Sequence, residues 1–155
     1  MTKLLKLAAV ALSLIFMAIQ FVRPSRDNPP VVADHSIEEH AELTPPISEV
    51  LNRSCMACHS NRTEWPWYSN VAPASWFVID HVNHGRSHLN FSEWTRYDRA
   101  EAEAHFKGIC ALSKGGAMPL DTYTLIHRGA RLSPADVKTL CDWAGAEGRR
   151  LASLN

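Results

Sequence analysis

Strand signals are nearly absent from this sequence, which also contains no internal repeat and no low-complexity tract. The lack of short runs that alternate apolar and polar residues argues against a sheet protein. The 155 residues suffice for one domain of ordinary size with a single hydrophobic core. We therefore predict an all-α fold, with about four helices connected by long ordered loops.

Caps and apolar periodicity place the predicted helices along the chain. The first begins at Thr44-Pro45-Pro46 and runs into the first cysteines, and the second runs from Ser75 to about His84, with Gly85 as its stop. The third extends from Asp98 to Lys114, and the fourth begins at Ser133-Pro134.

No basic stripe runs through the sequence. Four of the 16 Lys and Arg residues precede the first acidic residue, so 12 basic side chains accompany 16 acidic ones from Asp27 onward. A mildly acidic body of this kind argues against nucleic-acid binding, and we expect no nucleic-acid partner.

The N-terminus has neither a small-x-small cleavage site nor a lipidation cysteine. Two lysines precede an apolar run from Leu7 to Val22, LAAVALSLIFMAIQFV, which flanking leucines extend to about the length that spans a membrane. We predict that residues 1–26 form an uncleaved signal anchor, that is, a transmembrane helix; a cleaved export signal is the alternative. The polar residues 27–43 are predicted to form a tether or a strap, and residues 44–155 the folded domain.

The cysteines are too dispersed for a typical zinc site. Cys55 and Cys58 form one close pair, whereas Cys110 and Cys141 are single, so the second pair that zinc sites usually have is missing. A thioredoxin-like dithiol would follow a strand in an alternating β/α pattern, which this chain lacks. The remaining interpretation of S-C-M-A-C-H-S, residues 54–60, is a covalent haem anchor.

Haem attachment needs two thiols on one turn, which add to the two vinyl groups, and then an imidazole that reaches the iron. Cys55, Cys58 and His59 have this order. We therefore predict one covalent haem c, with His59 as the proximal iron ligand. This attachment takes place after export, so we expect a bacterial inner-membrane protein with its haem domain in the periplasm, or an exported protein if the signal is cleaved.

The segment Gly115-Gly116-Ala117-Met118-Pro119 supplies a candidate distal ligand. Its glycines let the backbone approach the porphyrin, and Met118 presents a soft thioether. The other three methionines lie in the anchor or inside the attachment motif. His81 is the alternative distal ligand, and Arg86, His88 and the Trp- and Tyr-rich loop are suited to hydrogen bonds with the two haem propionates.

Two further groups of residues carry predictions. Trp65, Trp67 and Trp76 are predicted to wall the haem pocket, the alternative being a partner-binding aromatic patch. Cys110 and Cys141 remain after haem attachment, and in an oxidising compartment we predict a disulfide between them that ties the scaffold of the Met118 loop to the last helix. The alternative is that both are small buried apolar side chains.

These motifs resemble the bacterial c-type haem-binding domain family, whose members are anchored or exported single-haem proteins distantly similar to cytochrome c. The resemblance extends from the end of the apolar segment through CMACHSNRTEWPWYSNVAPASW and HVNHGRSHLNFSEW to GGAMPLDTYTLIHRGARLSPADVKTLCDWA. It implies thioether roles for Cys55 and Cys58, a proximal role for His59 and a distal role for Met118. It also implies packing or pocket roles for Trp65, Trp67, Trp76, Asn90, Trp94, Tyr123 and Trp143.

We expect an electron carrier rather than an enzyme, in which a His/Met-ligated iron exchanges electrons with a partner protein that the sequence does not identify. No carboxylate or histidine cluster near Met118 is arranged for proton transfer, which favours the carrier. The alternative function is a haem-based peroxidase, or a gas or redox sensor, with a distal site that opens. A structural module with an inert haem would have the same sequence features.

Overall fold

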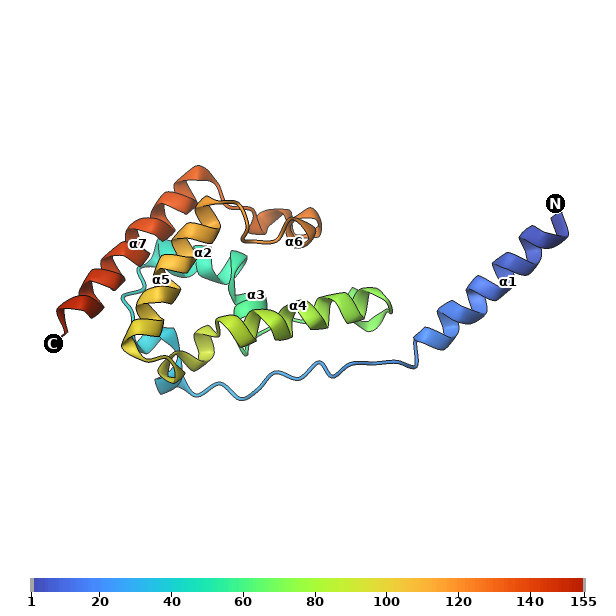
Figure 1. The fold of residues 1–155 in the computed structure, drawn as a ribbon, viewed down its shortest axis with the longest axis horizontal. Coiled ribbons are helices and arrows are strands. Elements are labelled where there is room, and N and C mark those ends of the chain that lie inside the picture. The colour runs from blue at the N-terminus through green and yellow to red at the C-terminus, as the bar shows by residue number, and fades with distance from the viewer. Residues whose placement is uncertain (1, 155) are drawn as a thin grey trace.

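The computed structural model describes residues 2–154, and every regular element in that range is helical. Figure 1 shows a helical domain from which a single helix, α1, projects. The prediction of an all-α fold is therefore confirmed. The α-helices are α1 (Thr2–Ile19), α2 (Pro45–Ser54), α3 (Met56–His59), α4 (Ala74–His88), α5 (Arg99–Lys114), α6 (Asp121–Ile126) and α7 (Pro134–Ser153), and the 3-10 turns are η1 (Ala33–His35), η2 (Ile37–Glu39), η3 (Trp67–Asn70), η4 (Phe91–Arg96) and η5 (Arg128–Ala130).

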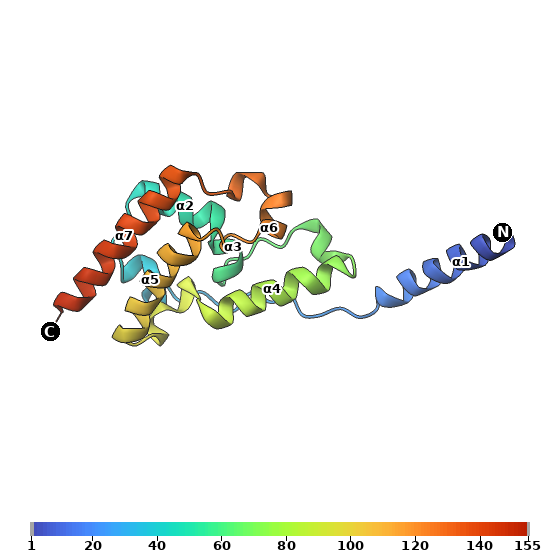
Figure 2. The same ribbon diagram turned by 45° about the horizontal axis from the view of Figure 1, so that its top comes forward.

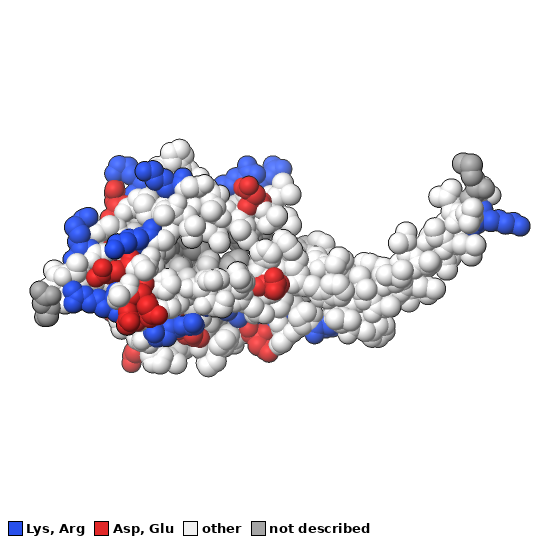
Figure 3. Space-filling view, viewed as in Figure 1, with Lys and Arg blue, Asp and Glu red and all other residues white. Residues whose placement is uncertain are grey.

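Helix α1 lies apart from the domain, and none of its described residues is buried. Within residues 2–154 it is the one helix whose length and composition would allow it to cross a membrane. In the space-filling view the visible face of α1 carries basic residues only near its start, and the rest of that face is uncharged (Figure 3). These properties suit a membrane anchor or a signal sequence.

Helices α5 and α7 pack side by side in opposite directions at one end of the domain, and both contribute to the hydrophobic core (Figures 1 and 2). Both start where the sequence predicts, because Asp98 and Ser133 each form a capping box with the third residue of the helix. Phe106 of α5 meets Trp143 of α7 edge to face, with ring centroids 5.2 Å apart. Leu140 is fully buried beside them.

A disulfide also joins α5 to α7. Cys110 and Cys141 are bonded, and their Cα atoms are 4.6 Å apart. The 31-residue separation between them includes the Met118 loop, α6 and η5. The bond therefore limits how far this part of the chain can move away from α5 and α7.

Residues 27–43 form a strap that runs along α4 and then enters the core (Figure 1). Near its start, the side chain of Asn28 donates to the carbonyl of Thr63 at 2.9 Å. Further along, Ile37 is fully buried in the hydrophobic core. At its end, the indole of Trp143 donates to the carbonyl of Glu42 at 2.9 Å. These contacts fix the segment along its whole length.

The prediction that Gly85 ends a helix is wrong, because α4 continues to His88 and its C-cap is Leu89. A Cβ added at Gly85 would lie 2.8 Å from the carbonyl oxygen of Cys58, nearer than such atoms approach in proteins. The missing side chain therefore allows α4 to lie directly against α3. The sequence pattern identifies the glycine but not the reason for it.

The domain also has more helices than the predicted four. Helix α3 is a single turn, and α6 has six residues in a stretch where we expected a loop. Helices this short contain too few residues to display an apolar repeat of 3.6.

Removing the disulfide with Cys110→Ser/Cys141→Ser should lower the free energy of unfolding by about 3–4 kcal/mol, because the unfolded chain regains the freedom of a long loop. Guanidinium titration of the detergent-solubilised chain measures the change. Reduction of the unaltered chain is the matched control and should produce the same loss. Equal stability with and without the bond would contradict the prediction.

The Gly85→Ala substitution should destabilise the domain by about 1–3 kcal/mol, since its methyl group would overlap the backbone of Cys58. The control is Gly108→Ala in α5, where nothing lies within 4 Å of an added Cβ. There alanine should raise stability by about 0.5–1 kcal/mol through its better helix propensity. Denaturant titration measures the free energy of unfolding of both variants. A change in the same direction in the two would contradict the prediction.

Candidate haem site

The predicted attachment residues lie at the junction of α2 and α3. The backbone of Cys55 leaves the helical region there, with φ −125° and ψ −45°. The chain then makes one turn, in which the N–H groups of Cys58 and His59 both donate to the carbonyl of Cys55, at 3.2 and 3.0 Å. This turn brings both thiols and the imidazole into one short segment, as the order of the motif requires.

The ring of His59 is held in one tautomer by the end of α4. Its Nδ1 is 2.9 Å from the carbonyl oxygen of Leu89, and because a carbonyl can only accept, Nδ1 carries the proton. The lone pair of Nε2 is then available to a metal. Burial holds the pKa of His59 below its usual value, an effect that the carbonyls of Leu89 and Gly85 partly offset. The ring is therefore neutral at pH 7.

Cys55 and Cys58 are free, partly buried thiols. Burial, together with the neighbouring Cys58, raises the pKa of Cys55 to about 12, while nearby Arg53 acts in the opposite direction. Burial also raises the pKa of Cys58, against the effect of Arg86. Both sulfurs are therefore protonated at pH 7. Residues 2–154 contain no group of three or more His, Cys, Asp or Glu side chains that could hold a metal ion, as a zinc site would need.

Arg86 connects the attachment segment to the strap. Although predicted to face a propionate, its buried guanidinium donates to the carbonyl of Ser60, the hydroxyl of Thr63, the carbonyl of Asp27 and the side chain of Asn28, at 2.6–2.9 Å. Four of its five N–H groups are thus used within the chain. One N–H group remains for a role toward haem.

The predicted indoles occupy three different environments. Trp65 is partly buried under the guanidinium of Arg86, 5.9 Å from the ring centroid, and its buried Nε1 has no hydrogen-bond partner within residues 2–154. Trp76 donates instead to the carbonyl of Val22, at 2.7 Å. Trp67 is 77% exposed. The Nε1 atom of Trp65 is therefore buried, whereas Trp67 does not form part of a buried pocket wall.

Met118 lies in the loop between α5 and α6. Helix α5 ends at Lys114, as predicted, with Gly115 as its C-cap, and Gly116 has φ +71°, a conformation that favours glycine. The N–H groups of Ala117 and Met118 both point back to the carbonyl of Leu112, at 2.9 and 3.2 Å. Met118 is partly buried. The alternative ligand His81, on α4, is also partly buried and bonds through Nδ1 to the carbonyl of Phe77 at 2.7 Å.

A pair of side chains that the sequence did not single out lies near the thiols. The hydroxyl of Tyr68 and Nε2 of His127 are 2.6 Å apart, and Tyr123 of α6 stacks on His127 with ring centroids 4.4 Å apart. Burial and then the proximity of Cys58 raise the pKa of both tyrosines, that of Tyr123 to about 12. Tyr123 is five residues after Met118, so the distal loop leads into the neighbourhood of the cysteines.

The residues present fit a haem. A neutral histidine with a free Nε2 follows two unpaired thiols on one turn, and the enclosed Nε1 of Trp65 is a donor without an acceptor in the described chain. A buried donor of this kind calls for a partner, and a carboxylate such as a propionate supplies one. No spacing in the sequence indicates the Tyr68–His127 pair, because its members are 59 residues apart.

The comparisons with known proteins agree with this chemistry. Residues 14–146, which include the end of α1 and most of α7, match the family model described as a haem-binding domain. No curated protein and no solved structure matches the chain. The match covers well over half of the sequence, and the chain therefore belongs to the haem-binding domain family.

Proposed function

We propose that this protein is a membrane-anchored electron carrier that holds one haem c, with thioether bonds to Cys55 and Cys58. The observation that carries the proposal is the hydrogen bond from Nδ1 of His59 to Leu89, on the turn that bears both free thiols. It leaves Nε2 free, so that His59 would ligate the iron of a bound haem, and it fixes the plane of the ring. The haem supplies an iron that alternates between ferric and ferrous states.

The protein's own part is to bind, orient and enclose. The turn from Cys55 to His59 presents two sulfurs and one nitrogen, and α4 supports it from behind through Gly85 and Leu89. Met118 is our proposed distal ligand, because it is a thioether in a loop held by α5 and by the disulfide next to it. Trp65 would donate from Nε1 to a propionate.

The membrane and the periplasm enter the proposal on two grounds. Helix α1 is exposed along its length and apolar enough to span a bilayer. The Cys110–Cys141 disulfide suits an oxidising compartment, which is also where covalent attachment of haem would take place. We therefore propose that α1 anchors the protein and that the haem domain lies on the periplasmic side.

A second candidate function has support from the Tyr68–His127 pair. A hydroxyl and an imidazole in hydrogen-bond contact can move a proton, which a peroxidase needs and a carrier does not. If Met118 left the iron, an open distal site would become available for peroxide or a diatomic gas. The carrier is preferred because the Met118 loop is fixed by backbone hydrogen bonds and by the nearby disulfide.

Covalent attachment predicts that haem stays with the chain on a denaturing gel. Peroxidase staining should label the unaltered protein and should be lost in Cys55→Ala/Cys58→Ala. The matched control is Cys110→Ser/Cys141→Ser, which removes two cysteines from elsewhere and should keep the stain. Extraction of the haem from the unaltered protein by acidic acetone would contradict covalent attachment.

Ligation by Met118 predicts a weak near-infrared band from sulfur-to-iron charge transfer in the ferric protein. Met118→Ala should abolish the band and let the ferrous protein bind carbon monoxide, while Met56→Leu should keep the band. Carbon monoxide binding by the unaltered protein would support the peroxidase or sensor. A bis-histidine spectrum that is lost in His81→Ala would assign the distal position to His81.

A further inference from the structure

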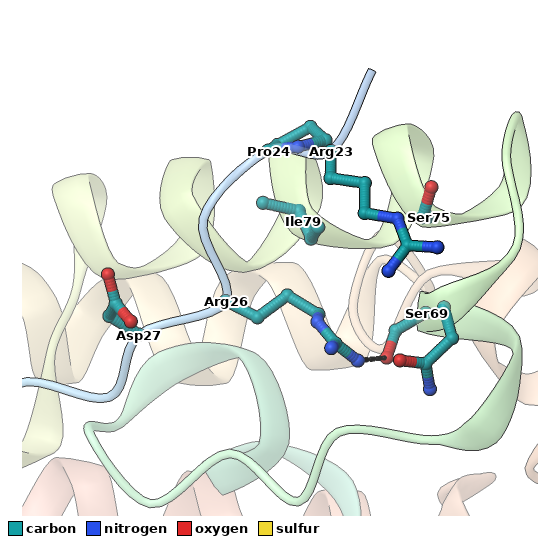
Figure 4. A pocket seen from close by; sticks show the side chains of 8 residues that line it. Arg23, Pro24, Arg26, Asp27, Ser69, Ser75 and Ile79 are labelled. Carbon is teal, nitrogen blue, oxygen red and sulfur yellow. Dashed lines mark hydrogen bonds between the residues drawn. The ribbon is translucent and has the colours of Figure 1, made fainter. Parts of the chain in front are cut away.

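A hollow of about 290 Å³ lies where the chain leaves α1 and meets the domain. Arg23 and Arg26 extend into it from the chain, and Ser69, Asn70 and Ser75 line it from η3 and the start of α4. Figure 4 shows the two guanidinium groups on the same side of the chain, directed toward Ser69 and Ser75. Neither the haem site nor the proposed electron transfer uses these residues.

The hollow carries an excess of positive charge. Within residues 2–154, neither arginine forms a salt bridge. Arg23 donates to the carbonyl of Gln20 at 3.0 Å, and Arg26 has a long contact of 3.4 Å with the hydroxyl of Ser69. One carboxylate, that of Asp27, also lines the space, and it accepts from Ser25.

Two guanidinium groups that share one small space repel each other unless an anion lies between them. A phosphate matches them well, because each planar guanidinium can donate two parallel hydrogen bonds to its oxygens. Ser75 lies in the first turn of the 15-residue α4, where the positive end of the helix dipole adds to the attraction.

A second hollow continues from the first and is mainly apolar. The two share Pro24 and Ile79, and the second is further lined by Pro73, Trp76 and Phe77. Asp80 and Asn83 also line this second hollow. A positively charged hollow joined to an apolar one fits a ligand with an anionic head and a hydrocarbon body.

Hydrogen bonds join the end of α1 to the segment just before α4, which lines both hollows. Gln20, the next residue after this helix, donates to the carbonyl of Ala72 at 3.1 Å and accepts from its N–H at 2.9 Å. The start of α4 is accordingly the part of the domain nearest α1 in both ribbon views (Figures 1 and 2). If α1 crosses a bilayer, the arginines lie at the depth of the lipid headgroups.

Exposed aromatic side chains occur at the same end of the domain. Trp67 in η3 is 77% exposed and Phe77 in α4 is 51% exposed. Tryptophan in particular is enriched at the boundary between a bilayer and water. The exposed Trp67 at this end of the domain is therefore suited to contact with a lipid surface.

We infer that the Arg23–Arg26 hollow binds the phosphate headgroup of an anionic phospholipid, whose hydrocarbon part lies along Phe77 and Trp76. The inference rests on the proposed membrane anchor. It assigns the membrane a specific contact with the haem domain in addition to the helix that crosses it.

The test uses the full-length, haem-loaded protein in dodecyl maltoside, titrated with phosphatidylglycerol and followed by native mass spectrometry. Arg23→Gln/Arg26→Gln should bind this lipid about 25-fold more weakly, since each basic residue at a lipid surface contributes roughly fivefold. The matched control, Lys107→Gln/Arg149→Gln, removes the same charge from exposed positions on α5 and α7 and should bind like the unaltered protein. Phosphatidylcholine and inorganic phosphate are the comparison ligands.

Equal binding of phosphatidylglycerol by the two double variants would overturn the inference. Inorganic phosphate that binds as tightly as the lipid would assign the hollow to a free anion and would also overturn it. A third result would also overturn the inference: Arg23→Gln/Arg26→Gln changes the haem spectrum but still binds the lipid. The arginines would then be assigned to contacts with the haem propionates. Haem staining tests covalent attachment and extraction of membranes with alkaline carbonate tests the anchor, so a failure of either can be told apart from a failure of lipid binding at the hollow.

Discussion

The last turn of α4 and its C-cap residue Leu89 contact Cys58, His59 and Ser60, and the geometry of the candidate site depends on these contacts. Gly85 allows the two backbones to approach, Arg86 donates to the carbonyl of Ser60, and the carbonyl of Leu89 accepts from the imidazole. Gly85 and Arg86 of α4 and its C-cap residue Leu89 thereby position three consecutive residues of another segment. Helix α3 is a single turn, too short to be stable on its own, and its contacts with α4 help to orient it.

The same turn links the site to the strap. The guanidinium of Arg86 reaches Thr63 on one side and Asp27 and Asn28 on the other, so residues far apart in the sequence share one donor group. Since the guanidinium is buried, each of these hydrogen bonds also compensates part of the cost of removing its charge from water. On the other side of the domain, the disulfide between α5 and α7 supports the Met118 loop. The candidate proximal and distal ligands are therefore held by different parts of the fold.

Much of the fold follows from local signals in the sequence. The starts of α2, α5 and α7 were predicted from Pro45, Asp98 and Ser133, because caps depend on residues within one turn of each other. The attachment motif is equally local. The role of Gly85 is not visible in the sequence, because it depends on a close contact with Cys58, 27 positions earlier, which no local pattern records. The Tyr68–His127 pair and the bonds of Arg86 were missed for the same reason.

The path of the strap has a consequence for the order of folding. Ile37 and Glu42 are among the first residues of the domain to be made, yet Glu42 bonds to Trp143 and Glu147, more than 100 positions later. Contacts of such long range can form only when the chain is almost complete. If the domain is exported as proposed, the residues that follow α1 cross first, and Cys55, Cys58 and His59 would be exposed while the core is still open. The machinery that attaches haem could reach these side chains during this interval, which would end when α7 packs against the strap.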